Sequence, residues 1–458
     1  MASLGCVILR NLSHRFKTAT AMAVAVFALS AGSAMAVPAF AIQTDKACQA
    51  CHVGGFGPQL TPYGREFKLH GYTERANTFN MPFSAMAVAS YVSTQKDQAA
   101  PPADHFSTNN NAAIDQVSLF VAGGLGSHLG GFVQTTYDGI GRTWSWDNLD
   151  LRAITVTHLR GKEVVLGLSL NNSPTVQDAW NTTPAWGFPF TSSALAPAPS
   201  ASPLFLGGLA QNTLGMAAYA WIDTTYYAEI AAYGSPGATT LTRLGADPFS
   251  PGDIVGLAPY GRVAYQTKVA GGTLEAGAFG MRTEINPGRD RTTGFRDRYG
   301  DVGLDASYQN ALDNGDVIAV DARYLHETQE LNATCALALT PGPSCANTRL
   351  DDLRANASYF WRDKFGATVA VFNTYGPANA ALYPNNRTFK PDSSGVTLQL
   401  DATPWGEGKS PLGPRFNTRV GVQYTIYDRF NGAAKNFDGA GANASDNNTF
   451  RIFTWFAY

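Results

Sequence analysis

From about Ser84 to the C-terminus, the chain repeats segments of roughly ten residues in which polar and apolar side chains alternate. Side chains of a β-strand point alternately to opposite faces, so each segment would have one apolar and one polar face. The segment from Asp301 to Gln309 shows this alternation. Beyond about residue 40, no run reaches the roughly 18 consecutive apolar residues of a membrane-spanning helix. The pattern therefore predicts the strands of a transmembrane β-barrel.

About sixteen such segments follow one another, and the links between them are alternately short and long. Outer-membrane barrels have short periplasmic turns and longer outer loops. The link from Pro404 to Pro414 is longer than this rule predicts. The segments begin near Ser84, Val117, Leu129, Leu149, Glu163, Leu214, Tyr226, Arg262, Thr273, Arg298, Val317, Asp352, Phe365, Val396, Arg415 and Thr449.

The last strand, Phe450 to Tyr458, is rich in aromatic residues and ends on one, which is typical of bacterial outer-membrane proteins. A soluble β-sandwich or propeller is the alternative, but no blade-length repeat is visible. We therefore expect an all-β fold, an antiparallel transmembrane barrel of about sixteen strands spanning residues 84–458. The predicted location is the outer membrane of a Gram-negative bacterium, with the N-terminus on the periplasmic side.

Composition excludes two other classes of protein. The 458 residues are 12% aromatic and 15% charged, with a formal net charge of −2. The high aromatic content argues against disorder, and the absence of a strongly basic stretch argues against a nucleic-acid partner.

The first 36 residues have the pattern of an export signal. Arg10, Arg15 and Lys17 precede a short apolar core at residues 21–29, and Ala34-Met35-Ala36 offers a signal-peptidase site. A second possible site is Ala39-Phe40-Ala41. Cleavage after Ala36 and cleavage after Ala41 are both left open. Either one predicts a mature chain in an oxidising compartment.

Cys48-Gln49-Ala50-Cys51-His52 matches C-x-x-C-H, the attachment signature of c-type haem. The two thiols would bond covalently to the haem, and His52 would be the proximal iron ligand. A structural disulfide or a redox C-x-x-C is the alternative interpretation. Met81 and His70 are the two candidates for the sixth iron ligand. The sequence thus predicts one covalent haem c in residues 37–83, and no catalytic side chain beyond it.

This segment is too short to build a substantial core of its own. We therefore expect it to fold inside or against the barrel, plugging the lumen.

Charged residues alternate with apolar ones in several strands and would face the lumen, where they could steer ions or simply pair with one another and with the plug. They are Asp150, Arg152, Asp305, Asp321, Arg323, Arg354, Arg415 and Arg419.

Cys335 and Cys345 fall in one long outer link, where a local disulfide is expected in an oxidising compartment. A metal site is the alternative, but only His326 lies nearby and no ligand set is visible.

A set of residues around the haem motif carries a family resemblance. Phe40-Ala41 precede the motif, and it is followed by Phe56, Pro58, Leu60, Gly64-Arg65-x-Phe67-Lys68, Gly71-Tyr72 and Pro82-Phe83-Ser84-Ala85-Met86. In these positions the chain resembles the fused outer-membrane monohaem cytochrome–porins of iron-oxidising bacteria. The specific part spans residues 40–86, and the barrel matches only in type and length.

The resemblance implies an electron conduit. It would take electrons from an extracellular donor, most readily ferrous iron, and pass them through one haem to a periplasmic cytochrome or similar carrier. Whether this makes the chain an oxidoreductase in the enzymatic sense stays open. The alternatives are a diffusion porin with a structural or gating haem segment, and a conduit that exports electrons to an extracellular acceptor.

Overall fold

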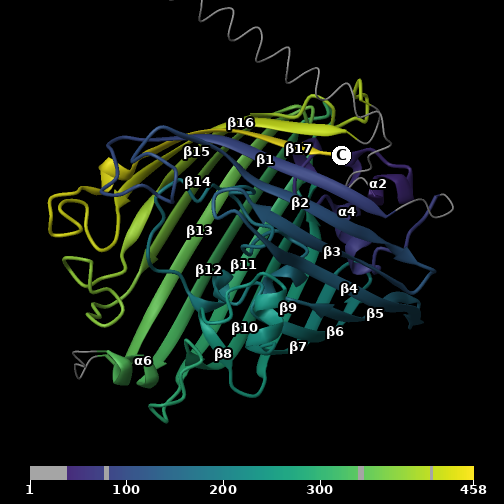
Figure 1. The fold of residues 1–458 in the computed structure, drawn as a ribbon. Helices are drawn as coiled ribbons and strands as arrows, with labels where there is room; N and C mark the ends of the chain where they lie inside the picture. The colour runs from purple at the N-terminus through teal and green to yellow at the C-terminus, as the bar shows by residue number, and fades with distance from the viewer. Residues whose placement is uncertain (1–38, 77–81, 339–344, 413–415) are drawn as a thin grey trace, which may run out of the picture. The chain divides into compact units, whose positions relative to one another are not determined.

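Sixteen long antiparallel strands pair in a closed ring in the computed structural model, which describes residues 39–76, 82–338, 345–412 and 416–458 (Figure 1). The first strand pairs with both the second and the last strand, and this closes the ring. A further strand of three residues, β8, pairs with β10 beside the long strands. The prediction of an all-β barrel of about sixteen strands is confirmed.

The strands of the ring are 9 to 17 residues long. In chain order, and with the short β8 included, the strands of the barrel are β1 (Phe83–Thr94), β2 (Asn111–Leu125), β3 (Leu129–Asp138), β4 (Thr143–Leu159), β5 (Lys162–Asn171), β6 (Leu214–Ile222), β7 (Tyr226–Gly234), β8 (Gly252–Ile254), β9 (Ala258–Val269), β10 (Gly272–Pro287), β11 (Asp297–Ala311), β12 (Val317–Leu331), β13 (Asn347–Trp361), β14 (Phe365–Tyr375), β15 (Ser393–Ala402), β16 (Asn417–Arg429) and β17 (Thr449–Ala457).

Alternating burial along each strand separates an inner from an outer face. In β11, Asp301 and Asp305 are 3% and 6% exposed, whereas Val302 and Leu304 between them are 63% and 58% exposed. Apolar side chains thus point outward and polar ones into the lumen, as in a membrane-spanning barrel. Among the described residues, no helix is both long and apolar enough to cross a membrane.

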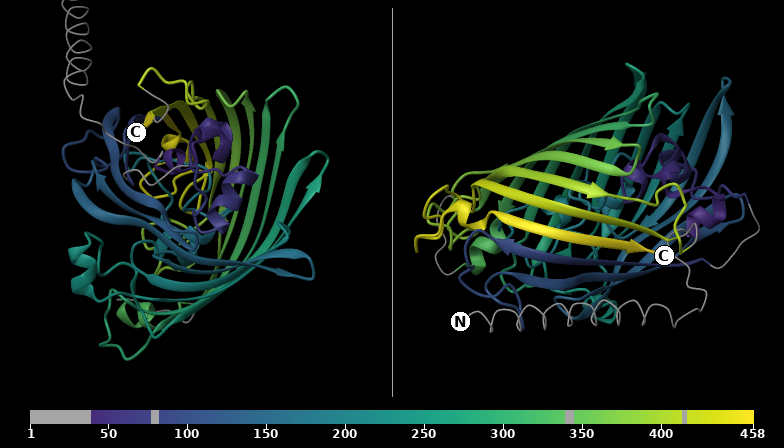
Figure 2. Two further views of the ribbon diagram at one scale, coloured as in Figure 1. Left: turned by 90° about the vertical axis from the view of Figure 1, so that its right-hand side faces the viewer. Right: turned by 90° about the horizontal axis from the view of Figure 1, so that it is seen from above.

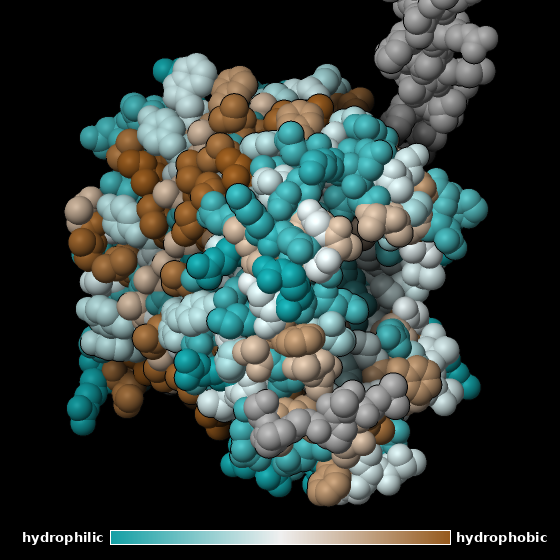
Figure 3. All heavy atoms as spheres, turned by 90° about the vertical axis from the view of Figure 1, so that its left-hand side faces the viewer, coloured by the Kyte–Doolittle hydropathy of each residue, from teal (hydrophilic) through white to brown (hydrophobic). Residues whose placement is uncertain are grey.

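The two ends of the barrel differ in their connections. At the short-turn end the links are tight, for example residues 160–161 and 362–364, with the predicted exception at residues 403–416. At the long-loop end they include residues 235–257, which contain α5 (Ala238–Arg243), and residues 332–346, which contain α6 (Asn332–Leu337). Figure 3 views this end, where hydrophilic side chains cover much of the centre and hydrophobic ones gather along one flank.

The link between β5 and β6, residues 172–213, folds into the barrel instead of remaining outside it. We call it the lumen loop. It contains η2 (Pro174–Gln177) and η3 (Leu204–Gly208). Val176 and Trp180 are 0% and 1% exposed. The loop contacts inward-facing side chains of strands far apart in the ring, including Arg262 of β9, Arg323 of β12 and Arg451 of β17.

The described residues 39–76 form a small helical unit, which we call the N-terminal segment. Its helices are α2 (Ala39–Thr44), α3 (Cys48–Cys51), η1 (Val53–Gly55) and α4 (Pro62–Leu69). Helix α4 begins with the hydroxyl of Thr61 accepting from the Gly64 amide and with proline at its first position. Figure 2 shows these helices, in purple, beside the strands. Leu69 joins an apolar cluster with Trp180 of the lumen loop and Trp221 of β6.

Candidate functional site

The C-x-x-C-H motif forms a single helical turn followed by an extended residue. Cys48 and Cys51 begin and end α3, and the His52 amide donates to the Cys48 carbonyl at 2.9 Å. Residues three positions apart in a helix lie on the same face, so both thiols share one side of the turn. Both cysteines are free thiols. The structure also has a disulfide between Cys335 and Cys345, with a Cα–Cα distance of 5.9 Å.

Burial sets the chemistry of the three predicted haem residues. It raises the pKa of the Cys48 thiol, and it raises that of Cys51 to about 12. A redox C-x-x-C pair instead depends on a lowered thiol pKa, so these cysteines are poorly suited to disulfide exchange. Burial also lowers the pKa of His52 to about 4, which keeps its imidazole neutral, as a metal ligand must be.

The residues present fit a covalently attached haem. They supply two reduced thiols on one helical face and a neutral imidazole next to the second thiol. The buried Nδ1 atom of His52 has no hydrogen-bond partner among the described residues. Such an orphaned buried atom is unusual in a finished protein interior, and it is consistent with a turn whose full surroundings include another group.

Close backbone packing fixes the turn between α4 and the barrel wall. A Cβ at Gly64 would lie 2.3 Å from the Cys51 carbonyl oxygen, so only glycine lets α4 pack against α3. Gly55 has a φ of +76°, and a Cβ there would lie 2.7 Å from the Asp363 carbonyl oxygen. The C-x-x-C-H turn, which we call the haem turn after its predicted cofactor, and the glycines that follow it are therefore packed closely against both α4 and the barrel.

Inward-facing side chains of the barrel hold the loop that follows His52. Arg419 donates to the Phe56 carbonyl at 3.0 Å and is ion-paired with Asp401 at 2.9 Å. Asn417 donates to the Gly55 carbonyl at 3.1 Å. The ring of Phe56 lies 4.9 Å from that of Trp455. These contacts come from the last two strands, β16 and β17, more than 350 residues away in sequence.

Helix α4 is anchored by polar contacts on several sides. Arg65 donates to Gln309 at 2.9 Å. Lys68 donates to the Val176 and Asp178 carbonyls at 2.7 and 2.8 Å. Further contacts run from Trp221 to Glu66, from Tyr72 to Asp150 and from Gln59 to Asp321. Apart from the lumen loop and Asp150, which lies near the middle of β4, the partners in the barrel lie in the half of the strands toward the short-turn end.

The two candidate sixth ligands have different outcomes. Met81 lies outside the described residues. His70 caps the C-terminus of α4, where its Nδ1 contacts the Glu66 carbonyl at 2.9 Å and its Nε2 contacts the Glu163 carboxylate at 3.3 Å. Both ring nitrogens of His70 therefore already have oxygen partners. A role for either residue at the iron stays a prediction.

Most of the predicted lumen charges are paired or hydrogen-bonded. The ion pairs are Asp150 with Arg152, Asp305 with Arg262, Arg323 and Arg354 with Asp352, and Arg419 with Asp401. Asp321 accepts from Gln59 and Ser307. Arg415 lies outside the described residues. In the described part of the chain, no group of three or more His, Cys, Asp or Glu side chains is placed to hold a metal.

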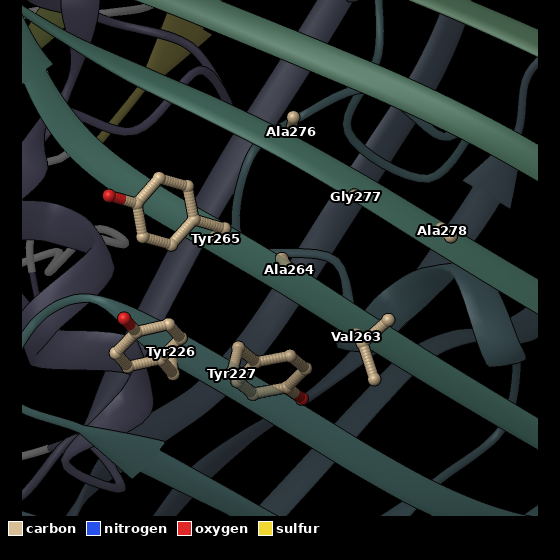
Figure 4. A pocket seen from close by; sticks show the side chains of 8 residues that line it. All are labelled: Tyr226, Tyr227, Val263, Ala264, Tyr265, Ala276, Gly277 and Ala278. Atoms are coloured by element: carbon tan, nitrogen blue, oxygen red, sulfur yellow. The ribbon is translucent and has the colours of Figure 1, made fainter.

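A hollow of about 440 Å³ lies on the outer surface of the barrel, over β7, β9 and β10 (Figure 4). Its lining includes Tyr226, Val263 and Tyr265, all about half exposed on the outward face. It does not include any of the predicted haem residues. This hollow is therefore part of the outer apolar wall and is separate from the candidate site.

The packing of α2 predicts where the export signal is cut. Ala39 is 5% exposed, and the Phe40 ring stacks on Tyr72 with centroids 5.1 Å apart. Cleavage after Ala41 would remove both contacts, whereas cleavage after Ala36 would keep them. We therefore expect the mature protein to begin at Val37. Mass spectrometry of the N-terminal peptide checks this, and a chain beginning at Ile42 would contradict it.

Comparisons with known proteins match solved structures only. A scan against protein-family models finds no match, and a search of curated proteins finds none of significance. The outer membrane channel DcaP of Acinetobacter baumannii aligns at a TM-score of 0.48 and 10% identity, over 85% of this chain and 99% of that one. OprB of Pseudomonas putida aligns at 0.48 and 13%, over 82% and 94%. An anion-selective porin from Comamonas acidovorans aligns at 0.44 and 12%, over 83% and 99%.

Proposed function

We propose that this protein is an outer-membrane electron conduit that carries one c-type haem on Cys48 and Cys51, with His52 as the proximal ligand. It takes electrons from an extracellular donor, most readily ferrous iron, and delivers them to a periplasmic cytochrome or similar carrier. The observation that carries the proposal is the C-x-x-C-H turn, with free thiols and a neutral imidazole, packed against the wall of a membrane-type barrel.

The position of the turn suits delivery to the periplasm. Short turns face the periplasm in outer-membrane barrels, so the short-turn end would be the periplasmic end. The Gln49 amide donates to the Gly406 carbonyl in the link at this end, at 3.3 Å. The haem, when bound, supplies a carrier that accepts and releases one electron at a time. The chain's own contribution is to hold that carrier where a periplasmic partner can approach it.

The N-terminal segment and the lumen loop together would plug the lumen. Lys68 and the Leu60 amide of the segment bond directly to the loop, at Val176, Asp178 and Asn181. The loop in turn reaches the wall at Arg451, which donates to the Thr191 carbonyl at 2.8 Å. Electrons could pass through such a filled barrel, whereas hydrated solutes could not. A filled lumen therefore supports the electron conduit over the second candidate, a diffusion porin, which the type of barrel alone would favour.

Proteoliposomes test the conduit directly. Full-length protein is reconstituted in vesicles that contain oxidised cytochrome c, and ferrous iron is added outside. We expect the protein's haem to show a reduced absorption spectrum and the trapped cytochrome to become reduced. A variant in which Cys48 and Cys51 are serine is the matched control and should give neither signal. Failure of ferrous iron to reduce the haem would contradict the leading proposal. Swelling of the same vesicles in small solutes would favour the porin.

A further inference from the structure

Two carboxylates face each other in the lumen toward the long-loop end, without a basic partner. Asp301 of β11 and Glu327 of β12 are direct cross-strand neighbours on the inner face. Their side chains are 3% and 0% exposed. No basic residue contributes to the electrostatic surroundings of either group. Most of the other lumen charges described above are ion-paired, and Asp321 accepts hydrogen bonds from neutral side chains.

Several oxygen atoms at this pair are left without hydrogen-bond partners. Among the described residues, the carboxylate oxygens of Asp301 have no hydrogen-bond partner other than the Glu327 carboxyl group itself. Gln329 donates its amide to Glu327 at 2.5 Å, and its own carbonyl oxygen Oε1 is buried without a partner. Gln329 is 7% exposed, so water reaches it poorly. Its amide therefore contacts the pair at Glu327 and carries a further buried oxygen without a partner.

The surroundings make this arrangement costly unless something neutralises it. Met281 lies opposite Asp301 across the strand pair, and Leu325 precedes Glu327 by two residues; both belong to an apolar cluster. Burying an unpaired carboxylate against apolar groups is strongly unfavourable. One shared proton would satisfy a single carboxylate–carboxylate contact but would leave the Gln329 oxygen without a donor. A cation can accept all of these oxygens at once.

We propose that Asp301, Glu327 and Gln329 bind one hard divalent cation of the Ca²⁺ type. Such ions take carboxylate and amide oxygens and complete their coordination with water. The Leu204 amide at the start of η3 donates to Glu327 at 2.5 Å, so the site is joined to the lumen loop. The cation would thereby lock this part of the loop to the wall. The inference does not depend on the haem.

Calcium binding to the full-length protein tests the site. The detergent-solubilised protein, freed of lipopolysaccharide and treated with a chelator, is dialysed to equilibrium against radioactive Ca²⁺. We expect one Ca²⁺ per chain, and slower hydrogen exchange in residues 199–213 when Ca²⁺ is present. The isosteric double variant D301N/E327Q should lose both the bound ion and the Ca²⁺-dependent protection.

The matched control is D247N/D313N, which removes two carboxylates from exposed loops and should keep both signals. If the double variant fails to assemble, D301N alone tests the site, because it leaves the two bonds to Glu327 in place. The proposal is overturned if the wild type binds neither Ca²⁺, Mn²⁺ nor Mg²⁺. It is equally overturned if D301N/E327Q binds as much Ca²⁺ as the wild type. If the two carboxyl groups bind one proton and no metal, the pair is stabilised by a shared proton and the proposal is overturned.

Discussion

Changing both Cys48 and Cys51 to serine is expected to give a barrel that assembles but carries no covalent haem. The thioether bonds of c-type haem require the two sulfur atoms, and serine oxygen does not form them under the same conditions. The contacts that hold the N-terminal segment to the barrel begin mainly beyond the turn, at the backbone of residues 54–60 and along α4. Assembly should therefore survive, whereas haem attachment should be lost completely.

Two measurements separate attachment from assembly. Peroxidase staining of a denaturing gel detects covalent haem, and the altered mobility of unheated samples detects a folded barrel. The comparison variant His52→Ala should keep the covalent stain, because both thiols remain, but its absorption spectrum should change with the loss of the proximal ligand. Covalent haem on the double serine variant would show that the attachment site lies elsewhere. A normal spectrum in His52→Ala would refute the ligand assignment.

The barrel could be predicted from sequence because the signal is local. Alternation with a period of two follows from the geometry of a single strand. The inward position of Asp301 and the outward position of Val302 can therefore be predicted without knowing which strands lie beside them. The predicted start of strands at Leu129, Leu214 and Tyr226 agrees with β3, β6 and β7. Other strands extend beyond the predicted segments: β2 begins at Asn111, not near Val117, because its pairing with β1 continues toward the long-loop end.

The surroundings of the haem turn could not be predicted, because they are assembled from residues distant in sequence. Asn417 and Arg419 reach Gly55 and Phe56 across more than 350 residues, and neither carries a motif. The inward course of the lumen loop cannot be predicted for a similar reason. Its length suggested an outer loop, but its inward course depends on partners such as Arg323 and Arg451 in strands on different sides of the ring. The sequence offers one indication of the inward course, which is Trp180, because an exposed loop seldom contains so large an apolar side chain.

Changing Lys68 to methionine is expected to remove a pH dependence from the docking of the N-terminal segment. Lys68 is 4% exposed, and burial lowers the pKa of its ammonium group to about 7. An undocked lysine has a pKa of about 10.4. Between these two values the undocked segment binds more protons than the docked one, so docking strengthens as pH rises. The free energy of opening should increase by about 1.4 kcal/mol per pH unit within this window and level off below pH 7.

Hydrogen exchange of residues 62–72 in the haem-loaded protein measures this opening, after correction for the intrinsic rate at each pH. The pH series should end near 9.5, because the docked segment also raises the pKa of Tyr72, and that effect weakens docking at higher pH. In Lys68→Met the slope should disappear. At pH 9 the opening free energy should fall by about 1–3 kcal/mol, because the variant loses two hydrogen bonds and leaves the Asp178 carbonyl without its donor.

The matched control is Lys46→Met, an exposed lysine of the same segment whose ammonium lies 4.9 Å from the Tyr63 ring. This variant removes the same charge without altering a buried amine, so it should keep the wild-type slope. A slope that persists in Lys68→Met would assign the titration to another group. A flat wild-type series would mean that Lys68 docks as a charged ammonium. Its two carbonyl partners favour the neutral amine, which has two N–H donors and matches them one to one.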